Sequence, residues 1–117
     1  MYLIFDTETT GLPQNWKAPL TDFNNWPRCV QLAWQVHDVE GKLVEVKNYI
    51  IKPEGYDIPF NAEKIHGIST GRANKQGMPL AEVLAEFVKD VEKCKFVVGH
   101  NVSFDNSIVG CELLRKD

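Results

Sequence analysis

Residues 2–11 of the chain read YLIFDTETTG. Its apolar run over residues 2–6 ends in a carboxylate, which predicts a buried central strand. In an extended chain the side chains of Asp6 and Glu8 point to the same face, with Cα atoms about 6–7 Å apart. Neighbouring anions repel each other unless a cation or a proton lies between them. The pair is therefore a candidate metal site at the end of this strand.

The next segment predicts a β-hairpin. Residues 29–37 alternate between apolar and polar side chains, which is typical of a half-buried strand. A turn at Glu40-Gly41 leads to a returning strand over residues 43–51. Residues 13–28, with two Trp and three Pro, are expected to form a loop with some packing of its own.

The second half predicts a helix, a strand and another helix. Residues 60–66 suggest a short helix, and a polar stretch follows from Ser69 to Gly77. An apolar stripe at helical spacing starts after Pro79, residues 95–99 predict a second buried strand, and a helix is expected from about Ser103. Because a helix crossing over usually leads to a parallel strand, we expect an α/β fold. Its mixed sheet combines antiparallel hairpin strands with one parallel strand and is flanked by helices.

A third carboxylate, Asp105, falls in the first turn of the last expected helix. The simplest interpretation is that it stabilises the helix dipole. The carboxyl ends of parallel strands meet at one sheet edge, however, so Asp105 is also expected near Asp6 and Glu8. Three carboxylates without a His or Cys cluster favour Mg²⁺ or Mn²⁺ over zinc. Two such ions can stabilise the attacking and leaving oxygens in phosphoryl transfer, so a phosphodiester is a plausible substrate.

Composition limits the alternatives. The chain has 117 residues, enough for one small domain, residues 1–117. Its net charge of −3 excludes a generally basic nucleic-acid coat but not metal-assisted binding. The apolar stretches are too short to span a bilayer, and no signal peptide is predicted, so no membrane partner is expected. Three widely spaced cysteines without a CxxC motif suggest reduced, mostly buried thiols and a cytoplasmic location.

Three motifs, in order, resemble those of the DEDD 3′–5′ exonucleases, the group that contains the proofreading (epsilon) subunit of bacterial DNA polymerase III. Residues 4–12, IFDTETTGL, resemble the first motif, and residues 99–105, GHNVSFD, resemble the second. Between them, residues 65–68, IHGI, resemble a segment typical of the family. The resemblance covers nearly the whole chain except the loop from Pro13 to Arg28.

The resemblance implies an RNase H-like fold, two Mg²⁺ or Mn²⁺ ions, and removal of nucleotides from a 3′ end. Asp6, Glu8 and Asp105 would be three of the four metal carboxylates, with Asp6 bridging both ions. The remaining implied substrate-binding residues are Thr7, Thr9, Leu12, His66, Asn101 and Phe104.

Several of these residues also have ordinary structural explanations. Phe104 lies on the apolar stripe of its helix and suits the core as well as a pocket, and Asn101 suits a turn or helix cap. His66, before Gly67, suits the end of a short helix. Of the three tryptophans, Trp34 is expected in the core, whereas Trp16 and Trp26 are left open between packing and base stacking.

The third motif of the family, a His or Tyr general base followed by the fourth carboxylate, has no counterpart after Asp105. Glu112 lies two turns along the same predicted helix and does not fit. We therefore expect an exonuclease domain truncated before this motif. Such a chain is expected to bind metal weakly, to show little activity alone, and to expose apolar surface through which it self-associates.

The expected partner is a single-stranded or frayed 3′ end of DNA, with RNA also possible, and a DNA polymerase subunit is a further possible partner. Two rival functions remain at this stage. An aspartyl-nucleophile phosphatase would use Asp6 at the end of a buried strand, but a helix rather than a hairpin would follow. A non-catalytic nucleic-acid-binding or polymerase-docking module would keep the fold without needing its carboxylates.

Overall fold

The computed structural model describes residues 1–99 and 102–116. The strands of its sheet are β1 (Tyr2–Thr9), β2 (Cys29–His37), β3 (Leu43–Ile50) and β4 (Phe96–Val98). The helices of the described chain are α1 (Phe60–His66), α2 (Thr70–Gln76), α3 (Leu80–Glu92) and α4 (Val102–Arg115). None of these helices is long and apolar enough to cross a membrane.

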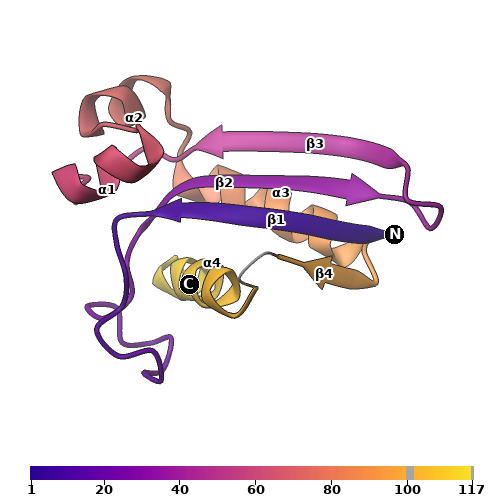
Figure 1. Ribbon diagram of the computed structural model, residues 1–117, viewed down its shortest axis with the longest axis horizontal. Coiled ribbons are helices and arrows are strands. Elements are labelled where there is room, and N and C mark those ends of the chain that lie inside the picture. The colour runs from indigo at the N-terminus through magenta and orange to yellow at the C-terminus, as the bar shows by residue number, and fades with distance from the viewer. Residues whose placement is uncertain (100–101, 117) are drawn as a thin grey trace.

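The strands form one mixed sheet in the order β3-β2-β1-β4 (Figure 1). β1 pairs with β2, and β2 with β3, in antiparallel fashion. β4 pairs with β1 in parallel, and Tyr2, Leu3 and Ile4 stand opposite Phe96, Val97 and Val98. This topology confirms the mixed α/β sheet with one parallel strand that the sequence predicts. It also directs the chain after β4 back towards the end of β1.

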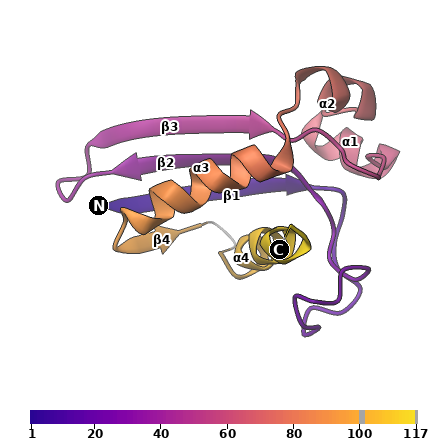
Figure 2. The ribbon, with the colours of Figure 1, turned by 180° about the vertical axis from the view of Figure 1, so that it is seen from behind.

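The main core lies between the sheet and α3, with α4 beneath β1 (Figure 2). The apolar positions of β2, which the alternation predicts to share one face, are all buried: Val30, Leu32, Trp34 and Val36. The Trp34 ring meets the Phe87 ring of α3 edge-on, with centroids 5.2 Å apart. Its indole N–H donates to the Asp90 carboxylate at 2.7 Å, so the polar atom of a buried ring is satisfied.

The thiols behave largely as predicted. Cys29 and Cys111 are buried and free, and Cys94 is free and half-buried. Burial raises the pKa of Cys29 well above its usual range, because the charged thiolate is poorly solvated there. Both buried thiols therefore serve as packing residues.

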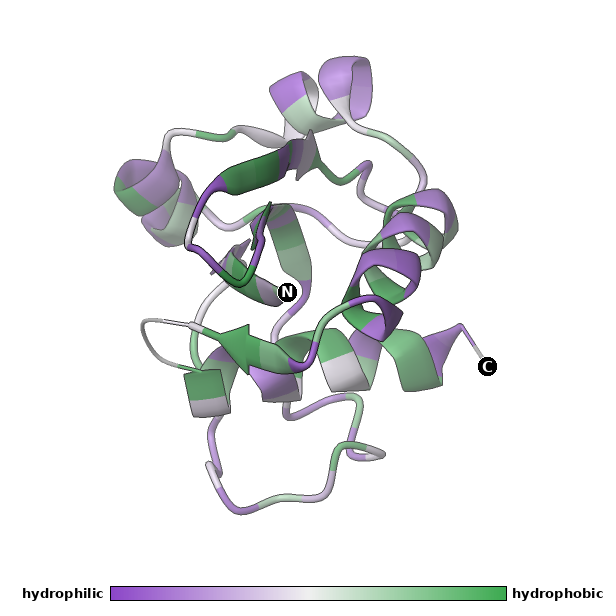
Figure 3. Ribbon diagram, turned by 90° about the vertical axis from the view of Figure 1, so that its right-hand side faces the viewer, coloured by the Kyte–Doolittle hydropathy of each residue, from purple (hydrophilic) through white to green (hydrophobic). Residues whose placement is uncertain are grey.

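The prediction that the second apolar strand is buried is wrong. All three residues of β4 are exposed, with Phe96 at 61%. β4 lies at the edge of the sheet and is hydrophobic throughout (Figure 3). An apolar groove, lined by Phe87, Val91, Val97, Val109 and Leu113, runs beside it between α3 and α4. The predicted exposed apolar surface is thus present among the described residues.

Two boundaries also differ from the prediction. β1 continues past Asp6 to Thr9, because β2 pairs with it along this whole length. The polar stretch after Ser69, for which no helix is predicted, forms α2. Its helix begins at a cap, in which the Ser69 hydroxyl accepts a hydrogen bond from the Arg72 N–H at 3.0 Å. Capping and tertiary position, rather than apolar periodicity, support this short helix.

The loop over residues 13–28 is fastened to α4 through Glu112. This carboxylate is fully buried and accepts hydrogen bonds from Arg28 Nε at 3.1 Å, the Cys29 N–H at 3.0 Å and Arg115 Nη1 at 2.6 Å. Arg115 also donates to the carbonyl oxygens of Phe23 and Trp26, at 2.7 and 2.8 Å. A buried carboxylate is tolerated only when its charge and lone pairs are satisfied, as they are here.

Replacing this carboxylate by an amide tests the fastening. We expect Glu112→Gln to lower the free energy of unfolding by about 3 kcal/mol, because two arginines lose their buried counter-charge. Urea unfolding followed by circular dichroism measures the change. The matched control is Glu40→Gln, which removes an exposed hairpin carboxylate paired with Lys42, and its midpoint should not shift. An equal midpoint for wild type and Glu112→Gln would show that the fastening contributes little.

Candidate active site

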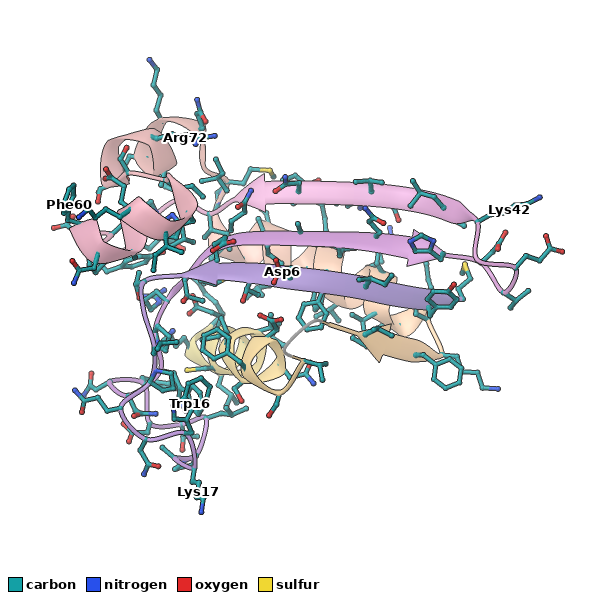
Figure 4. All side chains as sticks on the ribbon, viewed as in Figure 1. Asp6, Trp16, Lys17, Lys42, Phe60 and Arg72 are labelled. Atoms are coloured by element: carbon teal, nitrogen blue, oxygen red, sulfur yellow. The ribbon has the colours of Figure 1, made fainter. Side chains whose placement is uncertain are left out.

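The first two candidate carboxylates lie near the carboxyl end of β1. Asp6 is exposed and Glu8 is half-buried. Both stand on the face of β1 opposite to Phe5 and Thr7, which point to the core side. The pairing of β1 with β2 shifts register between Glu8 and Thr9, and such irregularities re-aim side chains at the ends of strands. Figure 4 labels Asp6 on β1, above α4.

Thr7 links β1 to the third candidate carboxylate. Its hydroxyl donates to Asp105 Oδ1 at 2.6 Å, and both residues are buried. Asp105 stands in the first turn of α4, as the sequence predicts. Gly99 packs closely beside this contact: a Cβ there would lie 3.3 Å from the carbonyl oxygen of Phe5, a tight approach, and in ordinary contact with Asp105 Oδ2 at 3.5 Å. The parallel strand therefore does bring the start of α4 to the middle of β1.

The pKa of Glu8 reflects its burial and the charged groups around it. Burial raises the pKa of Glu8 above its ordinary value, and the negative charges of Asp6 and Asp105 raise it further, whereas nearby His66 lowers it. Residues from β1, α4 and α1 thus act on one carboxylate. Negative charge is therefore concentrated at this end of β1.

The donor chemistry fits a hard divalent cation such as Mg²⁺ or Mn²⁺, since the candidate ligands are carboxylate oxygens. Among residues 1–99 and 102–116, however, no three His, Cys, Asp or Glu side chains gather closely enough to hold a metal ion. Asp105 is engaged by Thr7 on one side of β1, and Asp6 points to the other. The three carboxylates are therefore electrostatic neighbours rather than a closed ligand cage.

His66 ends α1 and faces the same region. Its Nδ1 accepts a hydrogen bond from the Ile68 N–H at 3.1 Å, which leaves the proton of a neutral ring on Nε2. That Nε2 is buried and has no hydrogen-bond partner among the described residues. Gly67, with φ of +75°, turns the chain immediately after the histidine. A buried donor left without a partner suits a ligand that brings an acceptor oxygen.

The remaining predicted substrate-binding residues are dispersed. Thr9 donates to the Gly11 carbonyl oxygen at 2.8 Å and so shapes the turn after β1. Leu12 is exposed on the following loop. Phe104 is half-buried, packs against the main core and contacts the Trp16 ring at a tilt. Asn101, with His100, lies outside the described residues.

Two features were not foreseen from the sequence. The hydroxyl of Thr7, one of the predicted substrate-binding residues, also donates to Asp105. The strict alternation of β1 is the signal that separates Thr7 from Asp6 and Glu8. Glu112, excluded above as a fourth ligand by its position in the helix, is occupied by two arginines.

Comparisons with known proteins bear on the family and the fold. A protein-family model described as exonuclease matches residues 3–115. The chain is 33% identical over 114 residues to the DNA polymerase III subunit epsilon of Rickettsia felis, and the match covers 95% of this chain and 43% of that protein. The chain therefore spans less than half the length of this curated relative.

Solved structures show the same fold. Exonuclease I of E. coli, in complex with a dT13 oligonucleotide, matches with a TM-score of 0.78 and 25% identity, over 97% of this chain and 23% of that one. A moderately thermophilic exonuclease I from Methylocaldum szegediense matches with a TM-score of 0.74 and 24% identity, over 92% of this chain and 22% of that one. The mixed sheet and its helices thus form part of an RNase H-like fold.

The pKa of Glu8 tests the electrostatic neighbourhood. We expect Asp6→Asn to lower this pKa towards its ordinary value, because a neighbouring negative charge is removed. We expect His66→Ala to raise it, because the favourable electrostatic interaction of His66 with the Glu8 carboxylate is lost. Carboxyl ¹³C shifts followed through a pH titration measure both changes. Asp38→Asn, in the β2–β3 turn, is the control and should leave Glu8 unchanged. Identical Glu8 titrations in wild type and Asp6→Asn would contradict the arrangement.

Proposed function

Because the chain belongs to the DEDD 3′–5′ exonuclease family, we propose that it carries the metal-binding carboxylates of an enzyme that removes nucleotides from the 3′ end of DNA. The reaction would be hydrolysis of the terminal phosphodiester by two-metal-ion catalysis. The observation that supports the proposal is that Asp6 and Asp105 both act electrostatically on Glu8 at one end of β1.

Asp6, Glu8 and Asp105 would hold Mg²⁺ or Mn²⁺ in this proposal. Bound there, a divalent ion supplies Lewis acidity and stabilises the charge on the attacking and leaving oxygens. The chain's own contribution is to position the ligands. Thr7 orients the Asp105 carboxylate, and the rigid pairing of β1 with β2 fixes the spacing of Asp6 and Glu8.

The neighbouring residues would bind the strand end. His66 Nε2 is a buried donor at the Glu8 side, suited to an oxygen of the terminal nucleotide. Thr9, Leu12, Asn101 and Phe104 are proposed to complete the pocket, with the exposed Leu12 against the terminal base. The raised pKa of Glu8 supports the proposal, because a cation there would offset the burial and the repulsion from Asp6 and Asp105 that raise it.

The substrate and partners are proposed from the relatives. The E. coli relative was solved with a DNA oligonucleotide, and another exonuclease I structure is a complex with SSB-Ct. We propose single-stranded or frayed DNA as the substrate, a proofreading or repair role in the cytoplasm, and a DNA polymerase subunit as a possible partner, as the name of the Rickettsia felis relative suggests. RNA remains the alternative strand.

The sequence after Asp105 also bears on the level of nuclease activity expected of these 117 residues. Neither a His or Tyr base nor a fourth carboxylate at the family's spacing follows Asp105 in residues 106–117. An attacking water needs a general base within hydrogen-bond reach. We therefore propose that these 117 residues by themselves bind metal weakly and hydrolyse DNA slowly.

The test is hydrolysis by the protein at the length that its gene encodes. We expect a 5′-labelled single strand to shorten stepwise from its 3′ end, only with Mg²⁺ or Mn²⁺ present. Asp6→Asn should lower the rate at least about 100-fold, because the stabilisation of developing charge is lost. Glu92→Gln, an exposed acid at the end of α3, is the matched control and should retain wild-type activity.

The outcomes separate the candidate functions. Metal-dependent shortening that Asp6→Asn leaves intact would contradict the assigned site. No hydrolysis, with DNA binding that is indifferent to Mg²⁺ and Mn²⁺, would favour the non-catalytic module. That alternative has one observation in its favour, since the described residues hold no closed set of three metal ligands.

A further inference from the structure

The three tryptophans of the chain have different environments. Trp34 and Trp26 are buried, at 1% and 4% exposure, and the indole N–H of each donates a hydrogen bond, Trp34 to Asp90 and Trp26 to the Pro19 carbonyl oxygen. Trp16 is 54% exposed. Two tryptophans are therefore explained by packing, whereas the third presents a large aromatic surface to solvent.

The loop that carries Trp16 is pinned on both sides of it. The Asn15 N–H donates to the Asn25 side-chain oxygen at 2.8 Å, and the Asn25 amide donates back to the Asn15 carbonyl oxygen at 2.9 Å. The loop ends are joined where the Thr10 N–H donates to the Arg28 carbonyl oxygen at 3.0 Å. An exposed side chain on a pinned loop loses little conformational entropy when it binds a ligand.

Trp16 also has a defined neighbour beside the candidate active site. Its ring lies 5.4 Å from the Phe104 ring, centroid to centroid, at an interplanar angle of 50°. Phe104 directly precedes Asp105, the carboxylate that Thr7 holds. The loop thus folds back so that the Trp16 ring contacts Phe104 in the first turn of α4, and Figure 4 labels Trp16 on this loop near α4.

We propose that Trp16 is a stacking wall for a nucleobase of the single strand whose end enters the site. This inference rests on the proposed function, which places the strand end at Asp105. An indole offers every base a π-face, so the contact would be tolerant of sequence. Lys17, exposed next to it at the edge of the loop, supplies a positive charge for the strand's phosphates (Figure 4).

Equilibrium binding without hydrolysis tests the proposal. The probe is a fluorescein-labelled oligo(dT) strand in buffer with EDTA, followed by anisotropy. Trp16→Ala should weaken binding about 5- to 100-fold, the range for loss of one base stack, and Trp16→Phe should stay within about threefold of wild type. The matched control is Phe60→Ala, which removes an exposed aromatic side chain from α1 and should bind as wild type.

A strand whose 3′-terminal nucleotides are abasic separates stacking from a general effect on the loop. On that strand wild type and Trp16→Ala should bind equally. Equal affinity on the ordinary strand, or an equal loss on both strands, would overturn the proposal. Intrinsic fluorescence gives a second readout, because oligo(dT) should quench wild type and not Trp16→Phe.

These results are distinguishable from failure of the proposed function. If Asp6→Asn abolishes hydrolysis while Trp16→Ala binds normally, the catalytic site holds and the stacking wall fails. If no variant of the natural-length protein hydrolyses DNA but the Trp16 effects appear, the chain binds strands without cutting them.

Discussion

The parallel pairing of β4 with β1 is the constraint on which the site depends. It engages only three residues on each strand, Tyr2–Ile4 and Phe96–Val98, yet it sends the chain into α4 beside the middle of β1. Because the ladder stops at Ile4, the rest of β1 is open on that side, and Thr7 reaches Asp105 there. A hydrogen bond between residues 98 positions apart in sequence thus follows from a short ladder.

The elements with a clear period could be predicted from sequence, and the contacts between distant segments could not. Alternation over residues 29–37 and the stripe after Pro79 match β2 and α3 closely. The exposure of β4 depends on whether another segment covers it, and the apolar residues of β4 alone do not indicate this. The short α2 depends on a Ser69 cap rather than on a period.

The candidate site shows the same division. Spacing alone places Asp6 and Glu8 on one face, and the order of the elements brings Asp105 near them. Which face of β1 Asp105 approaches depends on how deeply α4 packs, and the structure puts it beside Thr7 on the core side. The ion pair between Arg28 and Glu112 joins residues 84 positions apart, so no local sequence pattern indicates it. This ion pair nevertheless connects the loop that carries Trp16 to α4.

We propose that Asp6, Glu8 and Asp105 share one metal site although they stand on two sides of β1. Anomalous diffraction from crystals soaked in Mn²⁺ tests it most directly, because the signal locates the ion itself. We expect an anomalous peak between these carboxylates, with Asp105 among the residues that contact the ion. A peak elsewhere, or none between these residues at saturating Mn²⁺, would contradict it.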